Sequence, residues 1–165
     1  MHLALRRIPA ADATWLDKLF LAVIKARLVT EFPHAGMVIN GTLYHATARH
    51  GVCKTTDYTP ERWVLHDLGT ERDAVAQAKA ELLVELGTGY DFAELLDFTP
   101  LHFVVWLARL HPKLRVVLDS NLYCYQLCWL LMTSEYPDQR VTPERLLALK
   151  AANFPSARLV SPTEV

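Results

Sequence analysis

The strongest constraint on the fold of this sequence is a hairpin signal between residues 34 and 47. Its two arms are HAGMVI and TLYHAT, which are rich in apolar, β-branched and aromatic residues, as strands are. Between them stands Asn40-Gly41, the dipeptide best suited to a two-residue type I′ turn, because both turn residues need a positive φ. The pattern therefore predicts two antiparallel strands, over residues 34–39 and 42–47.

A two-residue turn also determines which residues face one another across the hairpin. The facing pairs are then Ile39 with Thr42, Val38 with Leu43, Met37 with Tyr44, and Gly36 with His45. His34 and His45 share one face as diagonal neighbours, about 7 to 8 Å apart at the backbone and closer at the rings. Such a pair can supply a general base and the second group that orients it. Gly36, opposite His45, is expected to leave open space for a substrate or another element.

The rest of the chain indicates one α+β domain. Strand patterns occur at 3–8, 62–68 and 114–118. Helix patterns occur at about 14–29, at 71–86, 101–110 and 122–132, and at two further starts, Asp91 and Thr142. Asp12 or Thr14 can cap the first helix, and Gly87 is placed to end the second. No repeat, linker or low-complexity tract divides the 165 residues, so we expect a single domain over residues 1–165.

Composition narrows the function classes. The net charge of -1 offers no basic stripe for a nucleic acid, which we therefore exclude as a main partner. The three cysteines cannot all pair within one chain, which favours a reducing compartment. No export signal is recognisable, and no apolar stretch approaches the roughly 20 residues of a membrane helix. We therefore expect a soluble, cytoplasmic protein without stable membrane insertion.

Cys124 is the candidate nucleophile. With Ser120 or Asn121 as the N-cap, it falls in the first turn of the 122–132 helix. Unpaired backbone N–H groups and the positive end of the helix dipole favour a thiolate there, so we expect a pKa below the usual value of about 8.5. The same N–H groups can stabilise an oxyanion. Cys128, one turn further along, is assigned to the core.

Each of these residues also has a structural interpretation. A cysteine on an apolar helix is often a small buried side chain, and a single histidine is often half-buried and hydrogen-bonded. Tyr90 and Asp91 can be a turn and a helix cap. The tryptophans interpreted as core residues are Trp63, Trp106 and Trp129.

A rival interpretation is a zinc site. The candidate ligands are His34, His45, His50 and Cys53. Their spacing matches no compact metal signature, and His50 and Cys53 are expected in a loop beyond the second strand of the hairpin. We therefore expect neither a metal nor another cofactor.

Four short segments resemble a known family. They are Pro33 to Ile39, Leu43 to Ala46, Gly89-Tyr90-Asp91-Phe92, and Tyr123-Cys124-Tyr125-Gln126. Together they resemble the circularly permuted branch of the NlpC-like papain-fold hydrolases, the YiiX-like proteins, and also lecithin retinol acyltransferase of the same broad group. In that branch the histidine strand precedes the cysteine helix, as it does here. The resemblance covers about residues 30 to 130.

The resemblance implies roles for three residues. His34 takes the place of the catalytic histidine, Cys124 that of the nucleophile, and His45 that of the third polar residue. The chain departs from the family pattern at Cys124-Tyr125-Gln126, where many members read Cys-Ser-Glu, and in lacking a Gly-Asp pair near its N-terminus. Similar short proteins occur in phage and prophage settings, which suggests a cell-wall or lysis-related role.

We therefore expect a papain-like (permuted NlpC-like) α+β domain, in which a small antiparallel sheet packs on a buried helix that carries the cysteine. The expected activity is that of a cysteine hydrolase, a thiol peptidase or amidase, that cleaves an amide bond through an acyl-enzyme. Its substrate would be a peptide, a peptidoglycan fragment or an acyl lipid. Two alternatives are a lipid acyltransferase or thioesterase of the same fold and a catalytically silent binding protein.

Overall fold

The computed structural model describes residues 1–7, 14–15, 18–19, 22, 25, 30–47, 49–91, 122–138, 140–154 and 159–160. Several expected features lie outside these residues: most of the 14–29 helix, the helix starting at Asp91, the 101–110 helix, the 114–118 strand, Trp106, and the candidate caps Asp12, Ser120 and Asn121.

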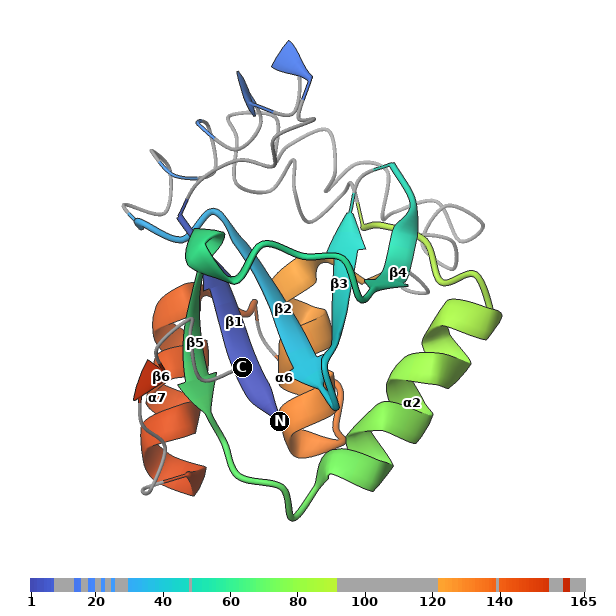
Figure 1. The fold of residues 1–165 in the computed structure, drawn as a ribbon, viewed down its shortest axis with the longest axis vertical. Helices are drawn as coiled ribbons and strands as arrows, with labels where there is room; N and C mark the ends of the chain where they lie inside the picture. Colours follow the sequence, from blue (N-terminus) through green and yellow to red (C-terminus); the bar gives the residue numbers. More distant parts are fainter. Residues whose placement is uncertain are drawn as a thin grey trace.

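The described chain is built around one antiparallel sheet of six strands (Figure 1). The strands are β1 (His2–Arg6), β2 (His34–Ile39), β3 (Thr42–Thr47), β4 (Gly51–Thr55), β5 (Trp63–Asp67) and β6 (Leu159–Val160). They are ordered β4-β3-β2-β1-β5-β6, and every neighbouring pair is antiparallel. Strand β1 thus lies between β2 and β5, although those two strands come later in the sequence.

The hairpin prediction is confirmed in position and in register. Asn40 and Gly41 have φ values of 50° and 74°, as a type I′ turn requires. Ile39 pairs with Thr42, and the pairing continues to Gly36 opposite His45. Because register sets the face of each side chain, the two histidines are on one face of the sheet.

The open space expected beside Gly36 is not there. A Cβ atom at Gly36 would stand 2.9 Å from the Leu43 side chain, 2.9 Å from the Tyr44 carbonyl oxygen and 3.2 Å from the His45 Cβ. The glycine therefore lets β3 approach β2 closely instead of leaving room for a substrate.

We expect Gly36→Ala to destabilise the protein by about 1–3 kcal/mol, because the added methyl group overpacks a closed site. Urea unfolding of the two proteins measures the difference. An unchanged midpoint would mean that the Leu43 side chain moves aside without penalty.

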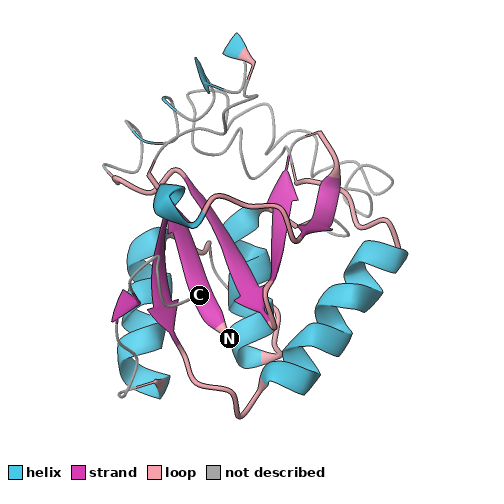
Figure 2. Ribbon diagram, viewed as in Figure 1, coloured by secondary structure: helices cyan, strands magenta, loops and turns pink. Residues whose placement is uncertain are grey.

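Three helices and a short 3-10 turn complete the described fold. The helices are α2 (Asp73–Glu85), α6 (Cys124–Thr133) and α7 (Pro143–Asn153), and the turn is η1 (Pro60–Arg62). Helix α6 packs behind the sheet against β2 and β3, with α2 and α7 on its two sides (Figures 1 and 2). Gly87, with φ 63°, follows α2 and ends it as predicted. Thr142 caps α7 by accepting a hydrogen bond from the Arg145 N–H.

The two faces of the sheet carry separate apolar clusters. The larger cluster fills the space between the sheet and the helices and includes Ala35, Met37 and Cys124. The smaller one lies on the other face and consists of Ala4, Val38, Leu43, Trp63 and Leu65, with Tyr58 packed against it. The α+β class is thus confirmed, with an antiparallel sheet packed on the helix that carries the cysteine. Among the described residues, no helix combines the length and the apolar character needed to span a bilayer.

Candidate active site

The two histidines of the hairpin are in hydrogen-bonding contact. Nε2 of His34 lies 3.1 Å from Nδ1 of His45, and the ring centroids are 5.4 Å apart. His34 is the first residue of β2 and is buried, whereas His45 is half-buried on β3. The contact predicted from the hairpin register is therefore confirmed.

Arg6 and Trp63 enclose the histidine pair on the same face. Arg6 on β1 is paired in register with His34 on one side and with Trp63 on the other. The Trp63 ring centroid lies 5.7 Å from that of His34 and 6.5 Å from that of His45. The guanidinium carbon of Arg6 lies 5.1 Å from the centroid of the Trp63 ring. Trp63 is buried, as predicted, but it also contacts the candidate site, which its sequence interpretation missed.

Burial and a nearby charge keep both imidazoles neutral at neutral pH. Burial lowers the pKa of His34 well below 6.5, and the charges of Arg6 and His45 lower it further. Burial and the Arg6 charge lower the pKa of His45 to about 4. A neutral imidazole can accept a proton, so either ring is able to act as a base.

These lowered pKa values make stability depend on pH. The unfolded chain takes up protons at its histidines below about pH 6.5, whereas the folded chain resists them until the pH approaches 4. Stability is therefore expected to fall as the pH decreases through this window. Urea unfolding at several pH values should show a weaker decrease for His45→Gln and an unchanged decrease for His50→Gln, the exposed control. An equal decrease in all three proteins would contradict the buried, neutral state of His45.

Cys124 is the first residue of α6. Its N-cap is Tyr123, in an extended conformation, rather than the predicted Ser120 or Asn121. The Gln126 side chain accepts a hydrogen bond from the Tyr123 backbone N–H at 3.2 Å. Gln126, the position where the chain departs from the family pattern, therefore stabilises the start of the helix.

The Cys124 sulfur lies near the backbone at the start of β2 and of α6, whose N–H groups lower its pKa. The N–H groups of Ala35, Tyr125 and Cys124 itself interact with it. The pairing of β2 with β3 ends at Gly36 and His45, one residue short of Ala35, whereas Ala35 is still paired with Leu5 of β1. Ala35 directly follows His34, so the sulfur and the histidine pair lie at the same end of β2.

The sulfur and the imidazoles do not share a face of the sheet. Cys124 packs with Ala35 in the larger cluster, between the sheet and the helices. His34 and His45 contact Trp63, which belongs to the cluster on the opposite face. Cys124 and His34 can therefore come into direct contact only beyond the end of β2, beside its first residues.

The pKa of Cys124 departs from the prediction. Burial raises it to about 11, and the backbone N–H groups and the Arg6 charge offset only part of that effect. The position at a helix N-terminus indicated a lowered pKa, but the thiol is only 3% exposed and desolvation outweighs the helix dipole. In the resting protein, a neutral thiol therefore stands near two neutral imidazoles.

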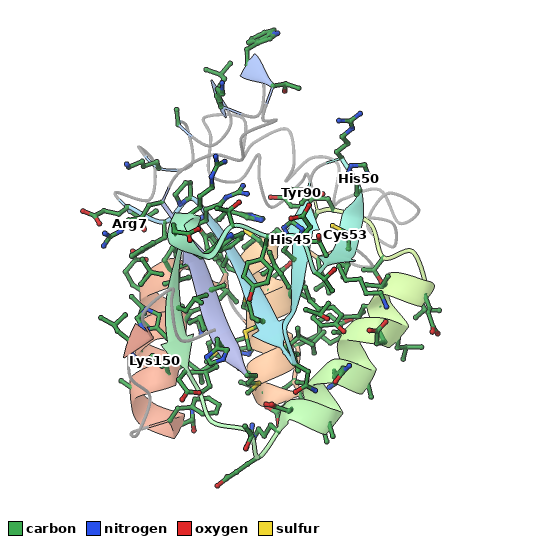
Figure 3. All side chains as sticks on the ribbon, viewed as in Figure 1. Arg7, His45, His50, Cys53, Tyr90 and Lys150 are labelled. Carbon is green, nitrogen blue, oxygen red and sulfur yellow. The ribbon has the colours of Figure 1, made fainter. Side chains whose placement is uncertain are left out.

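Tyr90 is a site residue that sequence reasoning missed. Hydrogen bonds connect residues 88–91 to β4 and to the start of α6: Val52 N–H to the Thr88 oxygen, 2.8 Å, and Leu122 N–H to the Gly89 oxygen, 3.2 Å. Burial raises the pKa of Tyr90, and a thiolate at Cys124 would raise it further, so the Tyr90 hydroxyl stays protonated. Figure 3 shows Tyr90 and His45 at the same end of the sheet. The sequence signal was the Gly89-Tyr90-Asp91 segment, which we interpreted as a turn and a cap.

Cys53 lies on a strand instead of in the predicted loop. It is part of β4 and is paired with His45, whose carbonyl oxygen accepts a hydrogen bond from the thiol at 3.6 Å. His50 stands exposed just before that strand (Figure 3). Within the described ranges, no three or more His, Cys, Asp or Glu side chains gather in a way that could hold a metal ion. Cys128 is fully buried in the larger cluster, as predicted.

Comparisons of the chain with protein-family models, with curated proteins and with solved structures found no match. The resemblance to the permuted NlpC-like hydrolases therefore stays a prediction from the sequence. The arrangement of the described side chains is the remaining guide to what the site can do.

Proposed function

We propose that this chain is a cysteine hydrolase of the amidase or peptidase type, with a permuted NlpC-like, papain-like fold. Cys124 is the nucleophile, His34 its base, and His45 the group that orients His34. The observation that carries the proposal is the hydrogen-bonded histidine pair at the end of β2, next to the Ala35 N–H that interacts with the Cys124 sulfur.

The contact between the rings assigns a task to each nitrogen of His34. Since Nε2 faces His45, Nδ1 is the atom left to accept a proton from Cys124. This role requires the tautomer in which His34 Nε2–H donates to His45 Nδ1. When His34 becomes an imidazolium, the same hydrogen bond becomes charge-assisted and stronger. His45 therefore holds the His34 ring in place and stabilises its charged form.

The reaction begins from a neutral thiol. As the sulfur attacks the amide carbonyl carbon, its proton passes to Nδ1 of His34, and the carbonyl oxygen gains the negative charge. In the proposed reaction the N–H groups at the start of α6 donate to that oxygen, and the protonated Tyr90 hydroxyl, whose pKa responds to Cys124, is a further donor. His34 then returns the proton to the leaving amine, and water releases the acyl group from Cys124. Transfer to another acceptor, as in an acyltransferase, would share every step up to the acyl-enzyme.

A catalytically silent binding protein is a second candidate. The low exposure and raised pKa of Cys124 favour it, because a sealed thiol cannot reach a substrate. The two candidates differ in whether the native protein forms a covalent adduct at this one residue.

Reaction with p-nitrophenyl acetate, followed by mapping of the acetylated cysteine by mass spectrometry, distinguishes them. We expect acetylation of Cys124 in the native protein, and the same result in Cys53→Ala, which removes the half-buried thiol as a control. Absence of an adduct before denaturation, or equal adducts at Cys53 and Cys124, would support the silent protein.

A further inference from the structure

The described residues between 14 and 25 include one exposed helical face. Five of them are both helical and exposed: Trp15, Lys18, Leu19, Ala22 and Lys25. The Lys18 N–H donates to the Thr14 oxygen at 3.0 Å, which is the i to i+4 hydrogen bond of an α-helix. Because residues three, four and seven positions apart are neighbours on a helix surface, the five lie on one side, which we call the Trp15 face.

The Trp15 face exposes two large apolar side chains. Trp15 is 72% exposed and Leu19 is 53% exposed. They stand four residues apart, so together they form a small apolar patch on the helix surface. Tryptophan combines a large apolar ring with a polar N–H, and it is favoured where an apolar phase meets water. An occupant of this face should therefore offer such a boundary.

Two lysines on the Trp15 face carry charge that is not neutralised. Within the described ranges, no acidic side chain forms an ion pair with Lys18 or Lys25. The exposed Lys54 differs, because its ammonium group is paired with Glu81. The described residues of the Trp15 face thus carry two positive charges and no negative one, so the complementary surface is anionic.

We infer that the Trp15 face docks reversibly on an anionic lipid surface. Trp15 and Leu19 enter the boundary between headgroups and acyl chains, while the ammonium groups of the lysines stay among the anionic headgroups. A second copy of the chain is a poor occupant, because a two-fold interface would set the lysines of one face against those of the other. The inference goes beyond the proposed hydrolase activity and uses none of its residues.

Docking would also orient the proposed active site. The chain runs from the end of β1 through residues 7–33 to His34, the first residue of β2. The described residues from 14 to 25 lie beyond that end of the sheet (Figure 1). A docked protein would therefore turn the end of the sheet that carries His34 towards the lipid.

Vesicle flotation tests the inference. The vesicles are phosphatidylcholine alone and phosphatidylcholine mixed with phosphatidylserine, each at low and at raised salt. The variants on the face are Trp15→Ala, Leu19→Ala, Lys18→Gln and Lys25→Gln. The matched controls are Leu82→Ala, which truncates a leucine on α2 that is 54% exposed, and Lys54→Gln, which removes the same charge elsewhere. Circular dichroism verifies that each variant is folded.

We expect the wild type to bind the mixed vesicles but not those of phosphatidylcholine alone, and to bind less as salt is added. Each lysine variant on the face should weaken binding about fivefold, the effect of one cation at an anionic membrane surface. Each apolar variant should weaken it about tenfold, because one large apolar side chain is no longer buried. Leu82→Ala and Lys54→Gln should bind like the wild type.

Two results would overturn the inference. The first is an absence of binding to the mixed vesicles at low salt, and binding to poly-L-glutamate in that case would assign the face to an acidic protein instead. The second is a loss of vesicle binding in the two controls equal to that in the variants on the face. Vesicle binding does not involve Cys124, so a chain that binds vesicles but is never acylated would refute the hydrolase and leave this inference standing.

Discussion

Replacement of Cys124 by alanine is expected to abolish acyl-enzyme formation while leaving the fold intact. Loss of a nucleophile removes the covalent route altogether, so acylation by p-nitrophenyl acetate should fall by at least about 10³-fold. The removed atom is a single buried sulfur, which should lower the unfolding free energy by only about 1–2 kcal/mol.

Cys128→Ala is the matched control for this variant. It removes the same atom from the same helix, one turn away, and Cys128 is as deeply buried. It should show a similar loss of stability and nearly unchanged acylation. If the two variants lose stability alike and neither changes acylation, Cys124 is a core residue and the chain is not a cysteine hydrolase.

Replacement of His34 by alanine is expected to lower the acylation rate by about 10²- to 10⁴-fold, the usual contribution of a positioned base. It should also change the pH dependence. If His34 accepts the thiol proton in the wild type, as proposed, activity should persist at neutral pH and be lost as the pH falls into the range where the histidine pair becomes protonated. Without His34, the rate should depend on the spontaneously ionised thiol, whose pKa is about 11, and should keep rising through the alkaline range.

Two other histidine variants test the proposed role of His34 further. His45→Ala should lower the rate less than His34→Ala, because it removes the hydrogen bond to the His34 ring and leaves the proposed base, His34, in place. His50→Ala should have little effect, since His50 is exposed. A His34→Ala variant with the wild-type rate and pH profile would show that the imidazole takes no part in the reaction. Stopped-flow measurement of p-nitrophenolate release provides both quantities.

The parts of the site that could be predicted are those set by local rules. The Asn40-Gly41 turn determines the register of its own hairpin, so the contact between His34 and His45 followed from a few neighbouring residues. The position of Cys124 in the first turn of its helix followed from the apolar segment after it, although the cap is Tyr123 and not the polar residues before it.

The parts that were missed depend on distant segments. Arg6 and Trp63 meet the histidines only because β1 inserts between β2 and β5, and no local pattern indicates that order. Cys53 was assigned to a loop because its segment is short and partly polar. It forms a strand because it pairs with β3, which the local sequence does not show. The pKa of Cys124 was predicted in the wrong direction because desolvation depends on how the whole domain packs around the thiol.

The central claim is that the Cys124 sulfur and Nδ1 of His34 act as one unit. The most direct measurement is a crystal structure of the protein treated with a peptide aldehyde, which an active thiol converts into a hemithioacetal. We predict a covalent bond between the aldehyde carbon and Cys124, with the new oxygen at the N–H groups that begin α6 and with His34 Nδ1 within about 3.5 Å of the sulfur. An unmodified Cys124, or a His34 ring that stays on the Trp63 face out of hydrogen-bonding reach of the adduct, would contradict the account.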